Sequence, residues 1–490
     1  MLLLGAALLP LAAWLRGPEY DEGYTAFVTS ANPRPIWPTT PFEVAATRAA
    51  FHPAASPWRI AENLRRTDVH PPLYFWTVWA WRRVFGSNLF TTRLLSVLCS
   101  LGALAFLGAI AIRGHYPLLA TLLITLGSYG FIETGIIARG FAMAQCLMLA
   151  GLFLTLRGGL AESPRIWLLL GAGLALGAAS FTNYLAAFTA AAAFAWLLWL
   201  WPRRAPWLVA GMLPFLLGDL FFFAAQRNSR IGQFPPFSGS GLIAALAHAA
   251  GGALFGGVPL YLPSGLVRAA LAVGLGILLG LLLLLPFLVW QRLRRRVPHH
   301  LFALAAIAPV LGLGLMGLIA GSVPVEIRYL SFAIPPFALL LAAALDCLPP
   351  RLAGGLLGTV LSVQACAIAG LMTRPETMQP EATAARAAWE AVGSEGLVLL
   401  PRGNDGVGVV SAFLTASPGT MHVMLVSPGT APAALTASLC FPPWPRVTMA
   451  AIAVDRDSRA TLPLLRQLIR VSAKCVDASA AAHLPYPPRS

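Results

Sequence analysis

The sequence predicts a polytopic α-helical membrane protein with a small C-terminal α/β domain. Hydrophobic residues make up 58% of the 490-residue chain, charged residues make up only 11%, and the mean hydropathy is +0.73. Soluble domains average about 25% charged residues. Charge-free runs such as 269–290 and 330–345 reach or approach the ~20 apolar residues that span a bilayer. These runs should be helical, because in lipid every backbone polar group must be satisfied within its own segment.

The apolar runs predict eleven membrane spans, joined by short polar links. The spans are 2–15, 94–112, 117–133, 140–157, 166–182, 185–201, 206–223, 265–290, 300–320, 329–347 and 352–372. The first is short. No cationic segment precedes it, so a span is expected there rather than a cleaved signal peptide.

Residues 71–85 are the one ambiguous apolar stretch. As a helix they reach only about 22 Å, and they contain three Trp, one Tyr and two Arg. Aromatic side chains favour the membrane interface. We therefore expect an amphipathic helix that lies on the membrane surface.

The distribution of arginine predicts the orientation. With 71–85 on the surface and the N-terminus inside, ten Arg of the later links fall on one side and five on the other. The ten are Arg113, Arg157, Arg165, Arg203, Arg204, Arg292, Arg294, Arg295, Arg296 and Arg351; the five are Arg139, Arg227, Arg230, Arg268 and Arg328. The positive-inside rule makes the richer side cytoplasmic. The net charge of +15 thus indicates membrane topology and not a nucleic-acid partner.

This topology predicts a protein of the inner (plasma) membrane with a cytoplasmic N-terminus. The membrane domain is 1–372. Its outer loop 16–93 carries the surface helix, and the shorter regions 224–264 and 321–328 also lie outside. The tail 373–490 is predicted to be periplasmic or extracellular.

The tail changes composition sharply. β-rich runs at 396–401, 422–426 and 447–454 are followed by a helical pattern at 460–471, which predicts a small α/β domain. Its Cys440 and Cys475 form either a disulfide, in an oxidising compartment, or two free thiols.

Unusual polar side chains gather on the predicted outer side. They are Asp21 and Glu22, Asp68 and His70, Arg93, Arg139, Asn183 and Tyr184, Asp219, and Glu326 with Arg328 and Tyr329. Each has a structural alternative. The acidic pair, His70 and Asn183 could serve helix ends. Arg93 and Arg139 could be interfacial anchors. Asp219 could pair with a neighbouring helix, although an intramembrane carboxylate is a functional candidate. Glu326 and Arg328 could form a local ion pair.

Taken together, these side chains suggest chemistry on a lipid phosphate. Arginine suits a phosphate ester through charge-assisted bidentate hydrogen bonds. A carboxylate nearby can remove a proton from an acceptor hydroxyl or amine. The combination fits transfer of a group from a lipid phosphate, with the phosphate as leaving group.

The order of motifs resembles a known family. The motifs are Asp21-Glu22, the run 70–74 (His-Pro-Pro-Leu-Tyr), the run 86–90 followed by 93–96 (Arg-Leu-Leu-Ser), 138–140 (Ala-Arg-Gly), 182–184 (Thr-Asn-Tyr), and 328–330 (Arg-Tyr-Leu) with Pro335. Over residues 1–372 this order is similar to that of the GT-C membrane glycosyltransferases of the family 39 type. The resemblance is to the branch with protein O-mannosyltransferases and lipid A aminoarabinose transferases.

The resemblance implies an inverting transfer of a sugar from a polyprenyl-phosphate donor to an envelope acceptor, which is a lipid, a glycan or a protein. Carried over by position, Asp21 is the base toward the acceptor or helps to place it, and Glu22 is its supporting neighbour. The residues implied in substrate binding are His70, Tyr74, Arg93, Arg139, Asn183, Tyr184, Glu326, Arg328 and Tyr329, with the arginines directed to the phosphate. No cofactor is certain, and a divalent metal at Glu22 is left open. Asn183 stands where many relatives carry His, which weakens a metal or base role there.

Two other classes are considered. A transporter or flippase of lipid-linked sugars should place ionisable groups near the bilayer midplane, whereas the predicted spans offer chiefly Asp219, off centre. A non-catalytic anchor for the outer domain would need far fewer than eleven spans.

Overall fold

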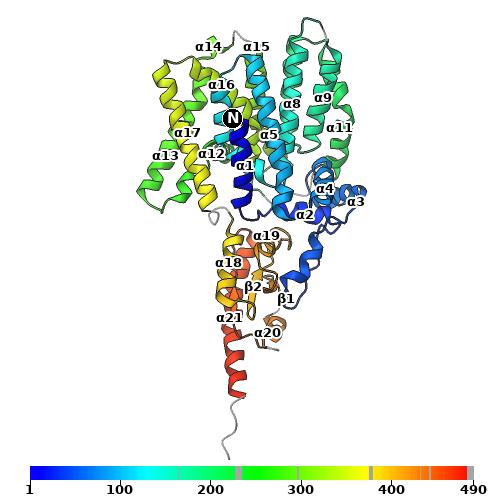
Figure 1. The fold of residues 1–490 in the computed structure, drawn as a ribbon, viewed down its shortest axis with the longest axis vertical. Helices are drawn as coiled ribbons and strands as arrows, with labels where there is room; N and C mark the ends of the chain where they lie inside the picture. Colours follow the sequence, from blue (N-terminus) through cyan, green and yellow to red (C-terminus); the bar gives the residue numbers. More distant parts are fainter. Residues whose placement is uncertain are drawn as a thin grey trace, which may run out of the picture. The chain divides into compact units, whose positions relative to one another are not determined.

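The chain forms two compact units (Figure 1). The structure is a computed structural model and describes residues 1–163, 165–226, 234–294, 297–374, 379–430, 432–440 and 443–482. The helical unit comprises Met1–Leu15 and Pro57–Thr373, and the α/β unit comprises Arg16–Ser56 and the chain from Arg374 onward. Residues 16–56 therefore cluster with the tail, although the sequence placed them in the membrane domain.

The helical unit forms a helix at each predicted span. Its elements are α1 (Leu2–Leu15), α3 (Pro57–Thr67), α4 (Leu73–Phe85), α5 (Leu89–Gly114), α6 (Leu118–Gly127), α7 (Tyr129–Ile136), α8 (Phe141–Gly159), α9 (Ile166–Ser180), α10 (Ala186–Leu200), α11 (Ala205–Gln226), α12 (Gly239–Phe255), η2 (Val258–Tyr261), α13 (Leu266–Leu288), α14 (Trp290–Leu293), α15 (Val297–Ala320), η3 (Ile327–Ala333), α16 (Ile334–Asp346) and α17 (Pro350–Thr373).

Apolar length confirms the predicted fold class. In the described part of the chain, seven helices are long and apolar enough to cross a membrane, or eight when the bent pair α6–α7 counts as one span. Helices α1, α9 and α10 are apolar but shorter. A polytopic helical membrane protein is thus confirmed, and eleven spans are compatible with these helices.

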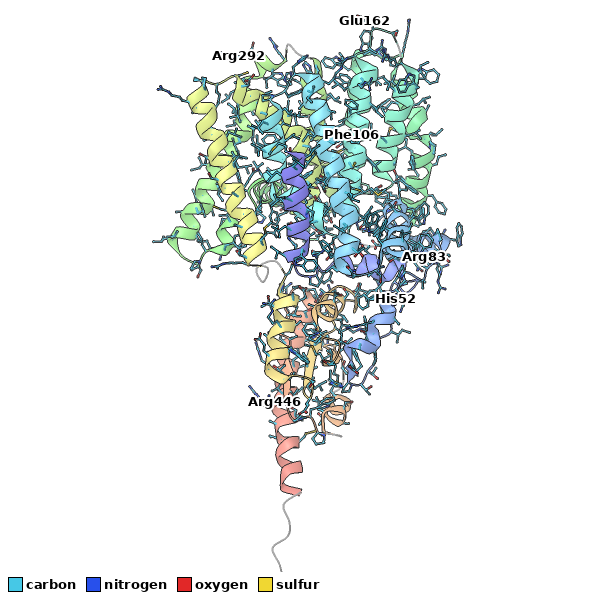
Figure 2. The ribbon with its side chains drawn as sticks, in the orientation of Figure 1. His52, Arg83, Phe106, Glu162, Arg292 and Arg446 are labelled. Atoms are coloured by element: carbon cyan, nitrogen blue, oxygen red, sulfur yellow. A yellow bond between two sulfur atoms is a disulfide. The ribbon has the colours of Figure 1, made fainter. Side chains whose placement is uncertain are left out.

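Cationic links share one end of the helical unit. Arg204 donates to the Gly158 carbonyl (3.1 Å) at the end of α8, and Arg292 donates to the Cys347 carbonyl (3.1 Å) after α16. Figure 2 shows Arg292 at one end of this unit and Arg83, on α4, at the other. The predicted orientation depends on this grouping. Four of the arginines counted for it lie outside the described residues: Arg227, Arg230, Arg295 and Arg296.

The expected surface helix 71–85 is α4. At 13 residues it is too short to cross a bilayer. The Leu73 N–H donates to the Phe181 carbonyl (3.3 Å) at the end of α9. Trp76 Nε1 donates to the Pro57 carbonyl (2.8 Å) at the start of α3. Helix α4 is therefore fixed against two other segments of the helical unit.

The region 224–264, predicted as an outer loop, instead contains helix α12 and the short η2. The sequence analysis assigned no helix here because α12, at 17 residues, is shorter than a span and rich in Gly and Ala; the outer placement of the region stays a prediction. Small residues allow close packing: Ala253 touches α7 at Gly130, and Gly252 touches Ile327. The Phe237 N–H donates to the Gly321 carbonyl (3.0 Å), which ties the start of this region to the end of α15.

The predicted span 117–133 is broken into α6 and α7, which are bent by 64° at Ser128. Ser128 accepts from the Phe131 N–H (3.4 Å) and caps α7. Gln364 of α17 donates to the Ile124 carbonyl (3.1 Å) near the end of α6. These polar contacts satisfy backbone groups that the break would otherwise leave unpaired in an apolar environment.

The α/β unit has a four-stranded sheet of order β1-β3-β2-β4. Its elements are α2 (Glu22–Thr29), β1 (Phe42–Glu43), η1 (Val44–Phe51), α18 (Pro380–Val392), β2 (Leu397–Pro401), α19 (Gly408–Ala416), β3 (His422–Val426), α20 (Pro432–Cys440), β4 (Val447–Met449) and α21 (Arg456–Ala482). Strand β2 is parallel to β3 and to β4, whereas β1 is antiparallel to β3. The three strands expected in the tail are present, with the last shorter than predicted.

Both faces of the sheet are covered. Val398 and Leu400 of β2 point to a core that includes Phe27, Trp37 and residues of α18 and α19. Leu399 points to a second core with α20 and α21. The first outer loop belongs to this unit because its apolar side chains complete the first core. The sequence left the pairing of Cys440 and Cys475 open, and the structure joins them as a disulfide between α20 and α21.

Candidate functional site

A buried polar cluster forms around His70, in the link between α3 and α4. The His70 Nδ1 atom lies 2.7 Å from Asp68 Oδ1. Arg139, between α7 and α8, places Nη2 3.3 Å from His70 Nδ1 and 3.5 Å from Nε2. Arg139 is only 4% exposed and its guanidinium lies over the Phe75 ring, 5.8 Å from the centroid. Two motifs 69 residues apart therefore meet at one point.

A second feature of the cluster is one guanidinium nitrogen of Arg139. Its Nη1 atom is buried and has no hydrogen-bond partner within the described residues. A buried charged donor without a protein partner is costly, and an ion, water or ligand that bonds to it would offset that cost. The cluster therefore offers an unsatisfied cationic donor to an anion.

Asp68 supplies the negative charge beside His70. Burial alone would raise the pKa of the Asp68 carboxyl, but His70, Arg139 and the Val69 N–H outweigh burial and hold this pKa below the usual range. The Val69 N–H donates to the carboxylate at 2.6 Å. Asp68 is thus a carboxylate at neutral pH.

Gln226, the last residue of α11, joins three segments at the cluster. It donates to the Leu64 carbonyl (2.9 Å) and to the His70 carbonyl (3.1 Å), and it accepts from the Tyr184 hydroxyl (2.8 Å). Burial raises the pKa of Tyr184, with Asp219 and Asp68 adding to the effect, so the hydroxyl remains a donor. The predicted Tyr184 is therefore tied to the His70 segment through Gln226.

Gly140 brings three motifs into contact. A Cβ at this position would lie 3.0 Å from the Thr182 carbonyl oxygen and 3.3 Å from Tyr74 Cβ. Asn183, next to Thr182, is 4% exposed and its Oδ1 accepts from the Leu185 N–H (3.1 Å). This is the helix-end role that the sequence offered as the alternative for Asn183.

The late arginine motif lies beside the start of α8. Arg328 Nε donates to Glu326 Oε2 (2.6 Å), and the Tyr329 hydroxyl donates to Glu326 Oε1 (3.2 Å). The Arg328 guanidinium lies over the Phe141 ring, 5.9 Å from its centroid. Phe141 follows Arg139 by two residues, so Arg328 and Arg139 both approach the start of α8.

Arg93 is buried against the C-terminal end of helix α1. It is 1% exposed and its Nη1 donates to the Ala13 carbonyl (2.8 Å) in the last turn of α1. A cation at the C-terminal end of a helix satisfies a free carbonyl and complements the helix dipole. The structure thus gives Arg93 a capping contact in addition to its predicted phosphate role.

The acidic pair lies in the α/β unit. Asp21 precedes α2 and its N–H donates to Glu19 Oε2 (2.8 Å). Glu22 is 5% exposed and accepts from the Glu19 N–H (2.9 Å). The capping alternative therefore describes Glu22 in part, whereas Asp21 makes no side-chain cap to α2.

Helix α2 is docked on α19. Gly23 packs so closely on Ser411 that a Cβ would overlap the serine side chain. The Tyr24 hydroxyl donates to Asp405 Oδ2 (2.9 Å), and Arg34 lies 3.5 Å from the same oxygen. The acidic pair is therefore held by its helix against the loop that follows β2.

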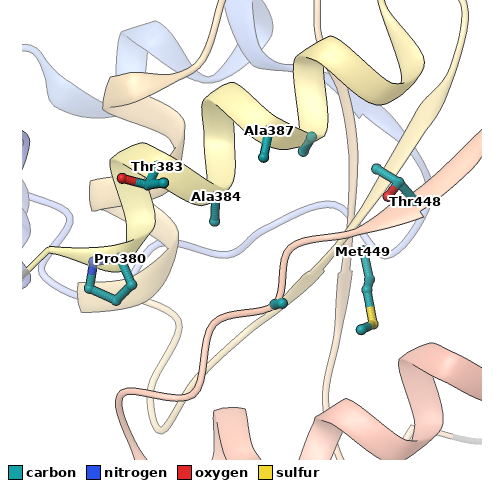
Figure 3. A pocket seen from close by; sticks show the side chains of 8 residues that line it. Pro380, Thr383, Ala384, Ala387, Thr448 and Met449 are labelled. Atoms are coloured by element: carbon teal, nitrogen blue, oxygen red, sulfur yellow. The ribbon is translucent and has the colours of Figure 1, made fainter. Parts of the chain in front are cut away.

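A pocket in the α/β unit lacks ionisable side chains. A pocket of about 300 Å³ lies between α18 and β4 (Figure 3). Its lining residues are Pro380, Thr383, Ala384, Ala387, Ala388, Thr448, Met449 and Ala451, none of them ionisable. Within the residues that the structure describes, no group of three or more His, Cys, Asp or Glu side chains could hold a metal ion.

Sequence reasoning missed two residues of the helical unit. Gln226 carried a weak signal, a single amide at the end of an apolar run. Arg82 of α4 is 3% exposed and interacts electrostatically with Tyr74; burial lowers its pKa to about 10, so it stays charged at neutral pH. Its position within an aromatic helix gave no sign of burial, because Arg in such helices usually reaches the interface.

The sequence was compared with known protein families and with the curated proteins. Residues 69–226 match the family described as dolichyl-phosphate-mannose-protein mannosyltransferase. This match confirms the predicted class, a membrane glycosyltransferase of the GT-C type. The matched segment runs from the His70 motif to Gln226, and so contains Arg139, Asn183 and Tyr184. No sequence among the curated proteins matches the chain.

Solved structures show weak similarity. ArnT from Cupriavidus metallidurans bound to undecaprenyl phosphate is 14% identical, with 89% of this chain and 86% of that chain covered and a TM-score of 0.49. The Archaeoglobus fulgidus oligosaccharyltransferase is 12% identical, with 86% and 62% covered and a TM-score of 0.40. The S. cerevisiae Pmt1-Pmt2 complex bound to the sugar donor is 15% identical, with 46% and 33% covered and a TM-score of 0.32.

Proposed function

We propose that this protein transfers a sugar from a polyprenyl-phosphate donor to an acceptor of the cell envelope, with inversion, on the outer face of the plasma membrane. The observation that carries the proposal is Arg139, a buried arginine beside His70, inside the segment that matches the mannosyltransferase family; among the described residues, its Nη1 atom has no hydrogen-bond partner. A phosphate oxygen would satisfy that nitrogen by a charge-assisted hydrogen bond.

The roles are assigned within each unit. In the helical unit, His70 and Arg139 bind the donor phosphate, with Arg328 and Arg93 as further cationic candidates. Tyr74, Asn183, Tyr184, Glu326 and Tyr329 shape the surrounding site. In the α/β unit, Asp21 takes the proton of the acceptor and Glu22 supports it.

The location follows from charge and cysteine chemistry. The arginine-rich links would face the cytoplasm, and the α/β unit with its Cys440–Cys475 disulfide would lie in an oxidising compartment outside. The acceptor is then an envelope lipid, glycan or protein.

The test uses full-length protein in detergent with polyprenyl-phosphate sugars as donors. Mass spectrometry of envelope lipids and glycans from a strain that lacks the gene would first identify the missing sugar and its acceptor. The purified protein should then transfer that sugar, with release of polyprenyl phosphate. Movement of the donor across vesicle membranes without any transfer would instead establish a transporter.

A further inference from the structure

The His70 ring contacts Asp68 and Arg139, and Gln226 holds its backbone; these contacts restrict the roles of the two ring nitrogens. Asp68 accepts from Nδ1 at 2.7 Å, so Nδ1 carries a proton and has no lone pair left. Gln226 holds the His70 backbone carbonyl at 3.1 Å. Only Nε2 can change its role with protonation.

The Arg139 side chain can only donate hydrogen bonds to His70. A guanidinium has five N–H groups and no acceptor. Arg139 Nη2 lies 3.3 Å from Nδ1 and 3.5 Å from Nε2. Because Nδ1 carries its proton toward Asp68, only Nε2 of a neutral ring has a lone pair to offer the arginine. With a protonated ring, Nε2–H and the arginine are adjacent donors, and a shared anion is needed to stabilise both.

The negative charge that favours the protonated ring is Asp68. It is 8% exposed, and its Oδ1 atom accepts from both the Val69 N–H and His70 Nδ1. An opposite charge at this distance favours the ionised form of a histidine. Arg139 also faces the ring, at 3.3 Å, and its positive charge opposes protonation until an anion is bound. Tyr184 interacts electrostatically with Asp68 and Asp219.

We propose that Asp68 is a positioning residue of the phosphate site: it orients the His70 ring and favours its protonated form, so that binding of the donor phosphate is coupled to uptake of one proton at Nε2. The proton comes from solvent, and no other bond forms or breaks in this step. The bound phosphate then accepts from His70 Nε2–H and from Arg139. This inference rests on the proposed function.

The test measures binding of farnesyl phosphate to the full-length protein in detergent, by titration calorimetry from about pH 6 to about pH 9, which spans the range of ordinary and charge-stabilised histidine. Titrations in buffers of different ionisation enthalpy report proton uptake. We expect wild-type binding to weaken as pH rises, and the half-loss to move down by about one pH unit or more in Asp68→Asn, as expected when a neighbouring opposite charge is removed.

Two variants separate positioning from folding. Asp68→Glu keeps the charge and should shift the pH profile less than Asp68→Asn. His70→Lys supplies a cation that does not titrate in this range, so binding should become independent of pH and proton uptake should vanish. In that background Asp68→Asn should no longer move the profile. The matched control is Glu62→Gln on α3, whose partly exposed carboxylate pairs only locally with Arg66; it should keep the wild-type profile.

The outcomes distinguish the two proposals. Identical pH profiles for wild type and Asp68→Asn, or a pH shift by Asp68→Asn that persists with Lys at position 70, would overturn the role of Asp68 while leaving the phosphate site intact. Absence of farnesyl phosphate binding by the wild type at every pH would contradict the proposed function itself.

Discussion

The two polar regions of this protein are held in place by different means. Around His70, side chains from four separate segments bond to one another: Asp68, Arg139, Tyr184 and Gln226 all take part. At the acidic pair, the Asp21 N–H and the Glu22 carboxylate both bond to Glu19, two and three residues away. Their helix is docked within the α/β unit through Gly23 and Tyr24.

This difference indicates a division of tasks. A cluster fixed by long-range bonds is preorganised, which suits stabilisation of a leaving phosphate. The proposed base, Asp21, belongs to the other unit and precedes a helix that Gly23 and Tyr24 dock on α19 and the loop after β2. Variants in the first region should therefore affect the donor, whereas variants in the second should affect proton transfer and the stability of the α/β unit.

Asp21→Asn should have the largest effect. Loss of a general base lowers kcat by about 10²- to 10⁴-fold, while binding of farnesyl phosphate should be unchanged because that binding is assigned to the helical unit. The measurement is the rate of sugar transfer by purified wild-type and variant protein at equal protein concentration. Glu22→Gln should cost less; near-wild-type transfer by Asp21→Asn would rule out its role as base.

Arg139→Ala should lower transfer by about 10²- to 10³-fold, the cost of removing one preorganised charged donor. In contrast to Asp21→Asn, it should also weaken farnesyl phosphate binding. The control is Arg66→Ala, which removes an exposed arginine of α3 and should leave both quantities unchanged. If Arg139→Ala bound the phosphate as well as wild type, the assigned phosphate site would be wrong.

Glu381 should make the stability of the α/β unit depend on pH. Burial raises the pKa of its carboxyl from 4.5 to about 7. Below pH 4.5 the group is protonated in the folded and unfolded states alike. Between about pH 4.5 and about pH 7 the unfolded state loses its proton while the folded state keeps it, so stability falls by at most about 3 kcal/mol across this window and is level above it.

Glu381→Gln should remove this loss, so that the thermal midpoint of the full-length protein exceeds the wild-type value at about pH 8. The exposed Glu390 on the same helix provides the matched control, Glu390→Gln. An equal pH dependence of the midpoint in wild type and Glu381→Gln would contradict the assignment.

Gly23→Ala should destabilise the docking of α2 on α19 by about 1–3 kcal/mol, the usual cost of overpacking. Ser411→Gly should restore the thermal midpoint when combined with it, because it removes the side chain that the new Cβ would overlap. Gly429→Ala, in the same unit with no atom near its Cβ position, is the control. Additive effects of the two changes would argue against this contact.

Tyr184→Phe should have the smallest effect. It removes the hydroxyl that donates to Gln226, a loss of about 0.5–1.5 kcal/mol. We expect a rise in KM for the donor with little change in kcat. Gln226→Leu should cost more, because it leaves the carbonyls of Leu64 and His70 without their donor. A Tyr184→Phe variant with lower kcat but unchanged KM would contradict the link through Gln226 to the phosphate site.

Features that depend on local sequence could be predicted, whereas those that depend on distant partners could not. Hydropathy predicted the positions of the apolar helices because length and apolarity are local properties, and the strand at His422–Val426 was found from its β-rich run. Helix α12 escaped because it is short and made of small residues. The break at Ser128 escaped because the partner that stabilises it, Gln364, lies 236 residues later.

The sequence by itself determined the class of protein, the helices and the motifs that hold most of the candidate residues, since each depends on composition or on short-range order. Only the tertiary structure decided that residues 16–56 join the tail, that Asp68, His70 and Arg139 meet, and that Gln226 ties Tyr184 to them. The physical reason is that buried polar groups need partners, and these partners come from segments far apart in the chain.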